Sequence, residues 1–251
     1  MDYGKLSSDY WQEQIKRIQL ILEKINERAE AVITGRQIPQ DEALLLGTGR
    51  HLEMAVLFLD ICDFSSRPSG TAAEQALTVH VFNLLFTELI RIAEDYGGTV
   101  EKNTGDGLMV YFEDGGGTPP EGGCKRSVAA ALTMFYAAQN GINPILENSN
   151  IPLLNFRIGI DYGPVTIAEL GAARRFRSRV AIGATANIAS KILNVAGLGD
   201  LIIGNDVYKR LPSAWTNEFV QIHTLQTGWI YVATGAPYPF YRYTGRWKSP
   251  M

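Results

Sequence analysis

The 251-residue chain is poor in the residues that build zinc sites and disulfide frameworks. It has only two cysteines, Cys62 and Cys124, which form no CxxC pair, and only three histidines. We therefore expect no dedicated zinc site and two reduced thiols. A large excess of charge of one sign is also missing. A formal net charge of -3 gives no overall electrostatic reason to expect nucleic acid as a partner.

Long hydrophobic runs are missing as well. No stretch approaches the roughly 18 uninterrupted apolar residues of a membrane-spanning helix. The N-terminus lacks the basic and apolar regions of a signal peptide. We therefore expect a cytoplasmic protein with no membrane span. A hydrophobic content of 46% is enough for the core of one large domain.

An amphipathic helix is predicted near the N-terminus. Between Ser8 and Thr34 apolar residues recur three and four apart, and Gly35 follows as a C-cap. Such a helix needs a partner for its apolar side, which is either its own domain or another subunit. A polar stretch then separates it from the main body. The sequence therefore divides into a helical segment with a linker, residues 1–48, and one domain, residues 49–251.

The main body has the element order strand, helix, strand, strand, helix, strand. That order indicates an α+β, ferredoxin-like sheet with helices on one face. Its elements are predicted at residues 54–59, 77–92, 99–102, 108–112 and 127–140 and on either side of Tyr162-Gly163-Pro164. A helix over residues 183–195 and extra strands at 201–203, 219–225, 229–232 and 240–243 are predicted to follow.

Two aspartates mark one edge of this predicted sheet. Asp60 ends the first strand, and Asp106 lies at the tip of the hairpin formed by the next two strands. A ferredoxin-like sheet brings these positions side by side. Two carboxylates held close together repel each other unless a cation lies between them, and hard oxygen ligands favour magnesium or manganese. The alternative is that each Asp only forms local hydrogen bonds in a turn.

Three blocks of sequence resemble the class III nucleotidyl cyclases. Residues 56–65, VLFLDICDFS, and residues 100–109, VEKNTGDGLM, resemble the two metal-site motifs of that family. Residues 157–165, RIGIDYGPV, and residues 183–191, GATANIASK, resemble its later strand pair and its nucleotide-contacting helix. The blocks occur in the family's order. The resemblance implies that residues 49–251 are a cyclase catalytic domain.

The resemblance also implies a two-metal site. Asp60, Asp106 and the backbone carbonyl of Ile61 would bind two Mg²⁺ or Mn²⁺ ions, while amides between Ile61 and Phe64 would receive the triphosphate of the nucleotide. One metal would lower the pKa of the ribose 3′-hydroxyl for in-line attack on the α-phosphorus, and the other would neutralise the leaving pyrophosphate. No protein nucleophile is needed.

Other positions correspond to nucleotide-binding residues of the family. Lys102 stands where the family has its base-recognising lysine. Asn187 and Lys191 stand where it has an asparagine that orients the ribose and a catalytic arginine that stabilises the transition state. In this family the two sets of residues come from different subunits. The resemblance therefore implies a head-to-tail homodimer with two shared sites.

The chain departs from the family pattern at several of these positions. Asp63 replaces a glycine, and it either adds a third carboxylate beside the metals or caps the turn. Lys191 replaces the transition-state arginine and lacks its planar, bidentate fork, so weaker phosphate binding is expected unless a neighbour compensates. Arg177 or Arg179 could be that neighbour, or both could belong to a solvated surface loop.

The base specificity is predicted from Val180. It stands where purine cyclases carry an Asp or Thr that hydrogen-bonds the base, so the purine-reading partner of Lys102 is missing. The chain resembles the pyrimidine cyclases of bacterial anti-phage Pycsar systems. This implies UTP or CTP as substrate, cUMP or cCMP as product, and a separate effector protein. Lys102 offers only donors, which suits the O4 acceptor of uracil and favours UTP.

Other functions stay open on the sequence. Lys102 also supports a conventional adenylyl cyclase, whereas Val180 and Lys191 weaken that reading. Asp63 and Lys191 also allow a catalytically weak, cyclase-like domain that binds nucleotide as a regulatory module. A protein-interaction scaffold without a ligand would leave the hairpin of Lys102 and Asp106 unexplained.

Overall fold

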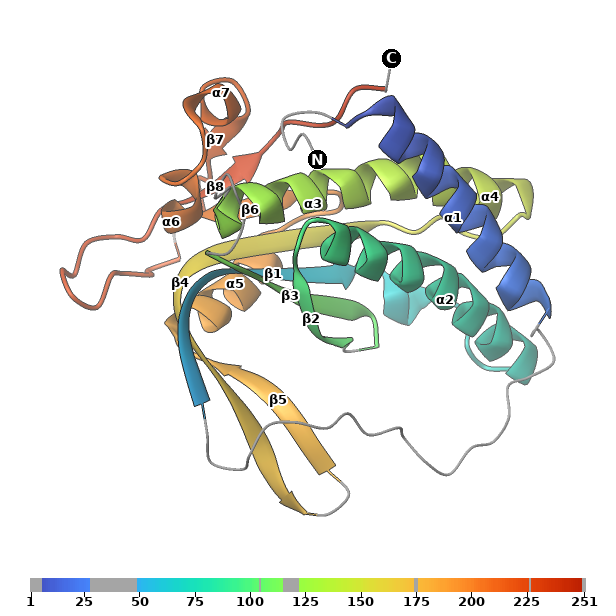
Figure 1. Cartoon of the computed structure of the whole chain (residues 1–251), viewed down its shortest axis with the longest axis horizontal. Coiled ribbons are helices and arrows are strands. Elements are labelled where there is room, and N and C mark those ends of the chain that lie inside the picture. Colours follow the sequence, from blue (N-terminus) through green and yellow to red (C-terminus); the bar gives the residue numbers. More distant parts are fainter. Residues whose placement is uncertain are drawn as a thin grey trace.

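The computed structural model describes residues 6–27, 49–103, 105–114, 122–173, 176–225 and 227–249. These residues form an eight-stranded sheet with helices on both faces (Figure 1). The strands are β1 (Gly49–Ile61), β2 (Thr99–Asn103), β3 (Gly107–Glu113), β4 (Phe156–Ala173), β5 (Phe176–Ile182), β6 (Leu201–Gly204), β7 (Val220–Ile222) and β8 (Phe240–Tyr243). The α-helices are α1 (Ser8–Glu27), α2 (Ala72–Asp95), α3 (Gly123–Ala137), α4 (Asn143–Asn148), α5 (Ala184–Val195), α6 (Asn205–Tyr208) and α7 (Ser213–Thr216).

The sheet has the strand order β2-β3-β1-β4-β6-β8-β7, and β5 pairs with β4. β1 lies antiparallel to both β3 and β4, and β6 runs parallel to β4. The β2-β3-β1-β4 part, with α2 between β1 and β2 and α3 between β3 and β4, is the predicted ferredoxin-like unit. The α+β prediction, with an N-terminal helix and extra C-terminal strands, is confirmed.

The two faces of β1 pack against different helices. Leu57 and Leu59 belong to the main core with α2 and α3, whereas Met54 and Val56 belong to a second cluster with Ala189 of α5. This alternation is the period of two that a strand imposes on its side chains. The expectation of helices on one face holds for α2 and α3 but not for α5, which covers the opposite face (Figure 1).

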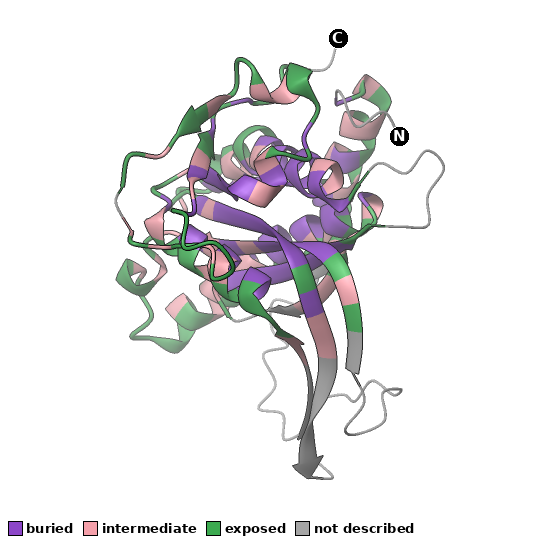
Figure 2. Ribbon diagram, turned by 90° about the vertical axis from the view of Figure 1, so that its left-hand side faces the viewer, coloured by how far each residue is buried: buried purple, intermediate pink, exposed green. Residues whose placement is uncertain are grey.

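α2 begins with a complete capping box. The Thr71 side chain accepts from the Glu74 amide, and the Glu74 carboxylate accepts from the Thr71 amide. By length and composition alone this helix could cross a membrane, as the only such helix in the described residues. In the structure its buried side chains, among them Leu85, Leu89 and Ile92, pack into the core. Figure 2 shows the buried residues gathered at the centre of the molecule, in the sheet and in the helices that pack on it.

α1 packs against its own domain. Ile18 is 1% exposed and belongs to the main core cluster, and the rings of Trp11 and Tyr136 meet edge to face with centroids 4.6 Å apart. Of the two partners considered for the predicted helix, the structure therefore has the domain itself. The part of the prediction between residues 28 and 34 lies outside the described residues.

Three predicted elements differ from the structure. No turn occurs at Tyr162-Gly163-Pro164, because β4 runs through it, paired with β1 up to Ala168. Residues 229–232 form only an isolated bridge between Ile230 and Pro237. The helix predicted to end at Asn140 changes at residue 138 into a π-helix, η2 (Ala138–Ile142), which leads directly into α4.

Candidate active site

The backbone places Asp60 and Asp106 next to each other at one end of β1. Asp60 is paired with Gly107 of β3, and the amide of Ile61 donates to the carbonyl of Asp106 at 2.9 Å. The two aspartates are therefore on neighbouring chain segments, on each side of one backbone hydrogen bond. This is the juxtaposition that the carboxylate-pair hypothesis requires.

Arg157 is a further member of the site that the sequence interpretation did not assign. It begins β4 opposite Asp60. Its Nε and Nη2 atoms donate to Oδ2 of Asp60 at 3.0 and 2.8 Å, and its Nη1 atom donates to the carbonyl of Ala196 at 3.2 Å. The sequence could have indicated this contact only through the pairing register of β1 and β4. Two antiparallel strands, one ending and the other beginning at the same edge, bring an aspartate and an arginine opposite each other.

The two carboxylates fit a hard divalent cation that takes some of its ligands from the protein and the others from a substrate. Among the described residues, Oδ1 of Asp60 and the carboxylate of Asp106 have no hydrogen-bond partner, and no group of three His, Cys, Asp or Glu side chains could hold a metal by itself. Magnesium is commonly held by one or two carboxylates with phosphate oxygens completing the shell. Burial raises the pKa of the Cys62 thiol, which makes it a poor metal ligand.

The loop after β1 has a left-handed residue at its centre. Asp63 has φ 57°, and its carbonyl accepts from the amide of Ser66 at 3.2 Å, which closes the short 3-10 helix η1 (Phe64–Ser66). Its exposed carboxylate makes no capping hydrogen bond. Asp63 therefore serves the turn through its backbone, and the side-chain cap is not formed.

Two of the amides that were expected to receive phosphate already have acceptors. The amides of Ile61 and Cys62 already donate to backbone carbonyls, those of Asp106 and Asn155. Those of Asp63 and Phe64 have no acceptor among the described residues. The expected phosphate-binding stretch is thereby narrowed to these two amides. The Phe64 ring packs on Phe82 with centroids 5.0 Å apart, which fixes this end of the loop.

The remaining predicted residues lie apart from the aspartates. Asn187 and Lys191 are exposed on α5, and neither makes a hydrogen bond or ion pair with Asp60 or Asp106 in the described part of the chain. Val180 is half-buried in β5, paired with Ala168. The side chains of Lys102, Arg177 and Arg179, by contrast, lie outside the described residues.

α5 is held closely on the sheet. A Cβ atom on Gly159 of β4 would lie only 2.6 Å from the Leu193 amide nitrogen and 2.8 Å from the Ala189 carbonyl oxygen. Glycine is needed here for the close approach of helix and strand. It places α5, with Asn187 and Lys191, on the sheet face opposite α2 and α3.

Comparisons with known proteins agree with this architecture. The family model of the adenylate and guanylate cyclase catalytic domain matches residues 47–235. An adenylate cyclase of Mycobacterium tuberculosis is 26% identical over 202 residues, which are 78% of this chain and 43% of the relative. A guanylate cyclase alpha of Plasmodium falciparum is 31% identical over 142 residues, which are 55% of this chain and 3% of that protein. The chain thus spans less than half the length of these curated relatives.

Solved structures share the fold. The guanylyl cyclase Cya2 superposes with a TM-score of 0.64 at 22% identity, covering 82% of this chain and 97% of that one. The adenylyl cyclase CyaB from P. aeruginosa gives 0.62 at 24% identity, covering 81% and 99%. With the family match over residues 47–235, the chain belongs to the adenylate and guanylate cyclase catalytic domain family, which is the class III nucleotidyl cyclase family.

Proposed function

We propose that this cyclase converts a pyrimidine nucleoside triphosphate, UTP in preference to CTP, into cUMP or cCMP and diphosphate at a two-metal site. The observation that carries the metal site is the adjacency of Asp60 and Asp106 across the hydrogen bond from Ile61 to Asp106. Asp60, Asp106 and the Ile61 carbonyl would hold Mg²⁺ or Mn²⁺. Bound metal would activate the 3′-hydroxyl and stabilise the charge on the leaving diphosphate.

The chain's own residues have three tasks in this proposal. Arg157 orients Asp60 through Oδ2 and brings positive charge to the phosphate end of the site. The amides of Asp63 and Phe64 donate to phosphate oxygens. Lys191 offsets the charge that develops on the phosphates in the transition state, with less directional contact than an arginine would make.

We propose that the site is completed by a second copy of the chain. Asn187 and Lys191 are exposed on α5 and separate from the aspartates, so an α5 from a partner could bring them to the phosphates. The hairpin of β4 and β5 extends away from the body and offers such a partner a long edge (Figure 1). A head-to-tail arrangement then gives two equal sites.

The choice of base rests on Val180. Its apolar side chain has no hydrogen-bonding group, so a base that needs a donor or acceptor there is left with an unpaired polar atom. Lys102 remains as the proposed reader of the uracil O4. A conventional adenylyl cyclase is the second candidate, because a curated relative of 26% identity is an adenylate cyclase.

One assay separates these candidates. The purified chain is incubated with equimolar ATP, GTP, CTP and UTP and Mn²⁺, and products are identified by mass spectrometry, with Asp60→Asn as the control. Cyclic UMP or CMP from the wild type alone supports the proposal. Cyclic AMP or GMP alone would rule out the pyrimidine assignment, and product from neither protein would favour a nucleotide-binding module.

We further propose that the product is a signal in anti-phage defence, read by a separate effector protein. This extends the resemblance to pyrimidine cyclases and has its own test. Cells that express the wild type or Asp60→Asn are challenged with phage, and cyclic pyrimidine nucleotides are quantified over time. A rise after infection only with the wild type supports the role, and unchanged levels contradict it.

A further inference from the structure

The loop that follows Asp60 is attached to the segment that leads into β4. The amide of Cys62 donates to the carbonyl of Asn155 at 2.8 Å, and Ile61 is paired with Phe156. The position of the Ile61 carbonyl, one of the proposed metal ligands, therefore depends on the position of residues 155 and 156.

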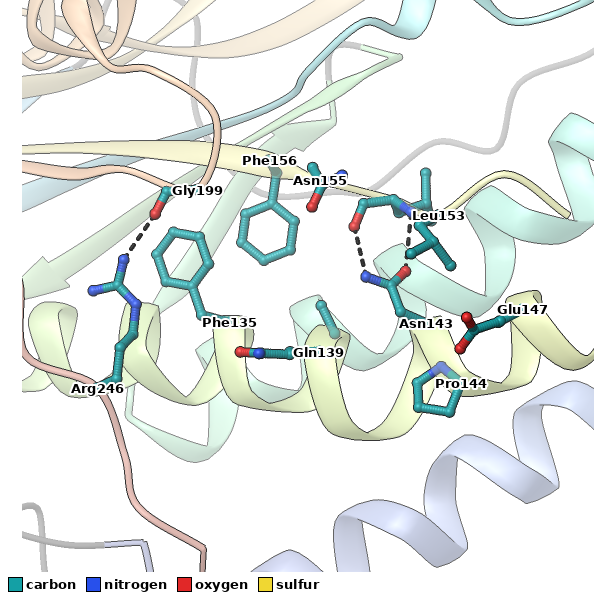
Figure 3. A pocket seen from close by; sticks show the side chains of 12 residues that line it. Phe135, Gln139, Asn143, Pro144, Glu147, Leu153, Asn155, Phe156, Gly199 and Arg246 are labelled. Carbon is teal, nitrogen blue, oxygen red and sulfur yellow. Dashed lines mark hydrogen bonds between the residues drawn. The ribbon is translucent and has the colours of Figure 1, made fainter.

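That segment is in turn held by one side chain, Asn143. Its Nδ2 donates to the carbonyl of Leu154 at 3.0 Å, and its Oδ1 accepts from the amide of Leu154 at 2.9 Å (Figure 3). A single amide thus satisfies both backbone groups of a buried residue, as a neighbouring strand would. Leu154 is 1% exposed.

Open space adjoins the segment beside Asn143. A cavity of about 400 Å³ is lined by Asn143, Asn155 and Phe156, together with residues of α3 and α4. Figure 3 shows Phe135 and Phe156 side by side among the residues that line it, and their rings are stacked with centroids 4.8 Å apart. Because Leu153 and Asn155 line this space, they have room to move into it once the Asn143 hydrogen bonds are lost.

The direction of Asn143 is set by the π-helix before it. Asn143 is the first residue of α4 and follows η2 immediately. A π-helix is a local insertion in the α-helical pattern and fixes how the next turn is rotated. In η2 the buried Gly141 packs against α1, where an added Cβ would lie 2.8 Å from Cδ1 of Ile18. α1 therefore contacts the element that sets the direction of the Asn143 side chain.

From these contacts we infer that Asn143 is a positioning residue for the metal-binding loop, and that the docking of α1 on Gly141 sets its position. The inference rests on the proposed metal site at Asp60, Ile61 and Asp106. It assigns the N-terminal helix an indirect effect on metal binding, transmitted through Asn143, Leu154 and Asn155 to Cys62.

The first test uses Asn143→Ala in the full chain, with Asn140→Ala as the matched control. Asn140 lies in η2, but its amide donates only within the helix, to the Tyr136 carbonyl at 3.1 Å. Mn²⁺ binding is followed by electron paramagnetic resonance with a 3′-deoxynucleoside triphosphate, and amide exchange is followed at Cys62. We expect roughly tenfold weaker Mn²⁺ binding and faster exchange at Cys62 for Asn143→Ala alone.

The second test keeps the Asn143 side chain and changes only the contact between Gly141 and α1. Gly141→Ala should weaken Mn²⁺ binding in the same direction, because its new methyl group displaces Ile18. Adding Ile18→Val removes the Cδ1 atom that it meets and should restore binding. This pair of variants also decides the matter if Asn143→Ala does not fold.

The outcomes separate the two proposals. If Asp60→Asn loses Mn²⁺ while Asn143→Ala binds and exchanges like the wild type, the positioning role is wrong and the metal site stands. If Asp60→Asn binds Mn²⁺ unchanged, the metal site itself is wrong. Equal effects of Asn140→Ala and Asn143→Ala, or no rescue by Ile18→Val, would also overturn the inference.

Discussion

Arg157 holds Asp60 by one carboxylate oxygen. Both of its hydrogen bonds to Asp60, at 3.0 and 2.8 Å, end on Oδ2, and Oδ1 has no partner among the described residues. The arginine can therefore fix the orientation of the carboxylate while one oxygen remains for a cation. Partners of this kind commonly support metal-ligating carboxylates.

Arg157→Gln should lower cyclase activity by roughly 10- to 100-fold and raise the Mn²⁺ concentration needed for half-maximal rate. The glutamine cannot make two charged hydrogen bonds to Asp60. Initial rates over a Mn²⁺ series measure the effect. Arg242→Gln is the matched control, because Arg242, which lies on β8, pairs with Asp200 at 2.5 Å. Equal rates for the two variants would contradict the role of Arg157.

Val180→Asp should shift base preference towards purines, because it adds a hydrogen-bonding group where β5 has an apolar side chain. The ratio of kcat/KM for ATP or GTP to that for UTP should rise by at least about tenfold, which corresponds to one hydrogen bond of roughly 1.4 kcal/mol. Ile182→Asp, two residues further along the same strand, is the control. A ratio that moves equally in both variants would argue against contact between residue 180 and the base.

The strength of the sequence pattern decided how much of the fold could be predicted. Strands β1 and β3 were recognised because their apolar runs end at Asp60 and begin after Gly107. The π-helix at Ala138–Ile142 could not be recognised, since it continues an α-helical pattern and packs through Gly141 against α1. That packing is tertiary, and local propensity does not contain it.

The residues of the candidate site also differ in how far the sequence pattern revealed them. Asp60 and Asp106 stand in motifs, so their spacing in the sequence already indicated a pair. Arg157 also stands in a motif, but its contact with Asp60 depends on the register between β1 and β4. Asn143 stands in no motif, and only the folded chain shows that it holds Leu154. Residues that act through other residues leave little trace in a single sequence.

Arg17→Ala should destabilise the protein by about 3 kcal/mol, because it leaves the fully buried Glu88 without its cation. Arg17 contacts Glu88 at 3.1 Å and Asp95 at 3.4 Å. Urea unfolding measures the change. Arg91→Ala is the control: Arg91 is 55% exposed and pairs with Asp95 at 3.2 Å, so its loss should cost under about 1 kcal/mol. Similar losses would mean that the α1 ion pair contributes little.

Asp161 makes folding stability depend on pH. Its carboxyl group is 2% exposed and accepts from the Tyr238 hydroxyl at 2.5 Å. Burial raises the pKa of this carboxyl group to about 7. The hydrogen bond from Tyr238 and the charge of Arg210 lower the pKa, and the charge of Asp206 raises it further. The folded protein thus keeps a proton that the unfolded chain loses near its ordinary pKa of 3.8. The contribution of Asp161 to the free energy of unfolding is fully present below pH 3.8 and is lost as the pH rises towards 7.

Asp161→Asn should remove this dependence, because asparagine can accept the same Tyr238 hydrogen bond without ionising. Between pH 5 and pH 7 the unfolding free energy of the variant should gain roughly 2 kcal/mol relative to the wild type. Tyr238→Phe should act in the opposite sense, since losing this donor raises the pKa further and extends the loss to higher pH. Denaturant unfolding at each pH measures both. A constant difference between wild type and Asp161→Asn from pH 5 to pH 8 would show that Asp161 is already ionised in the folded state.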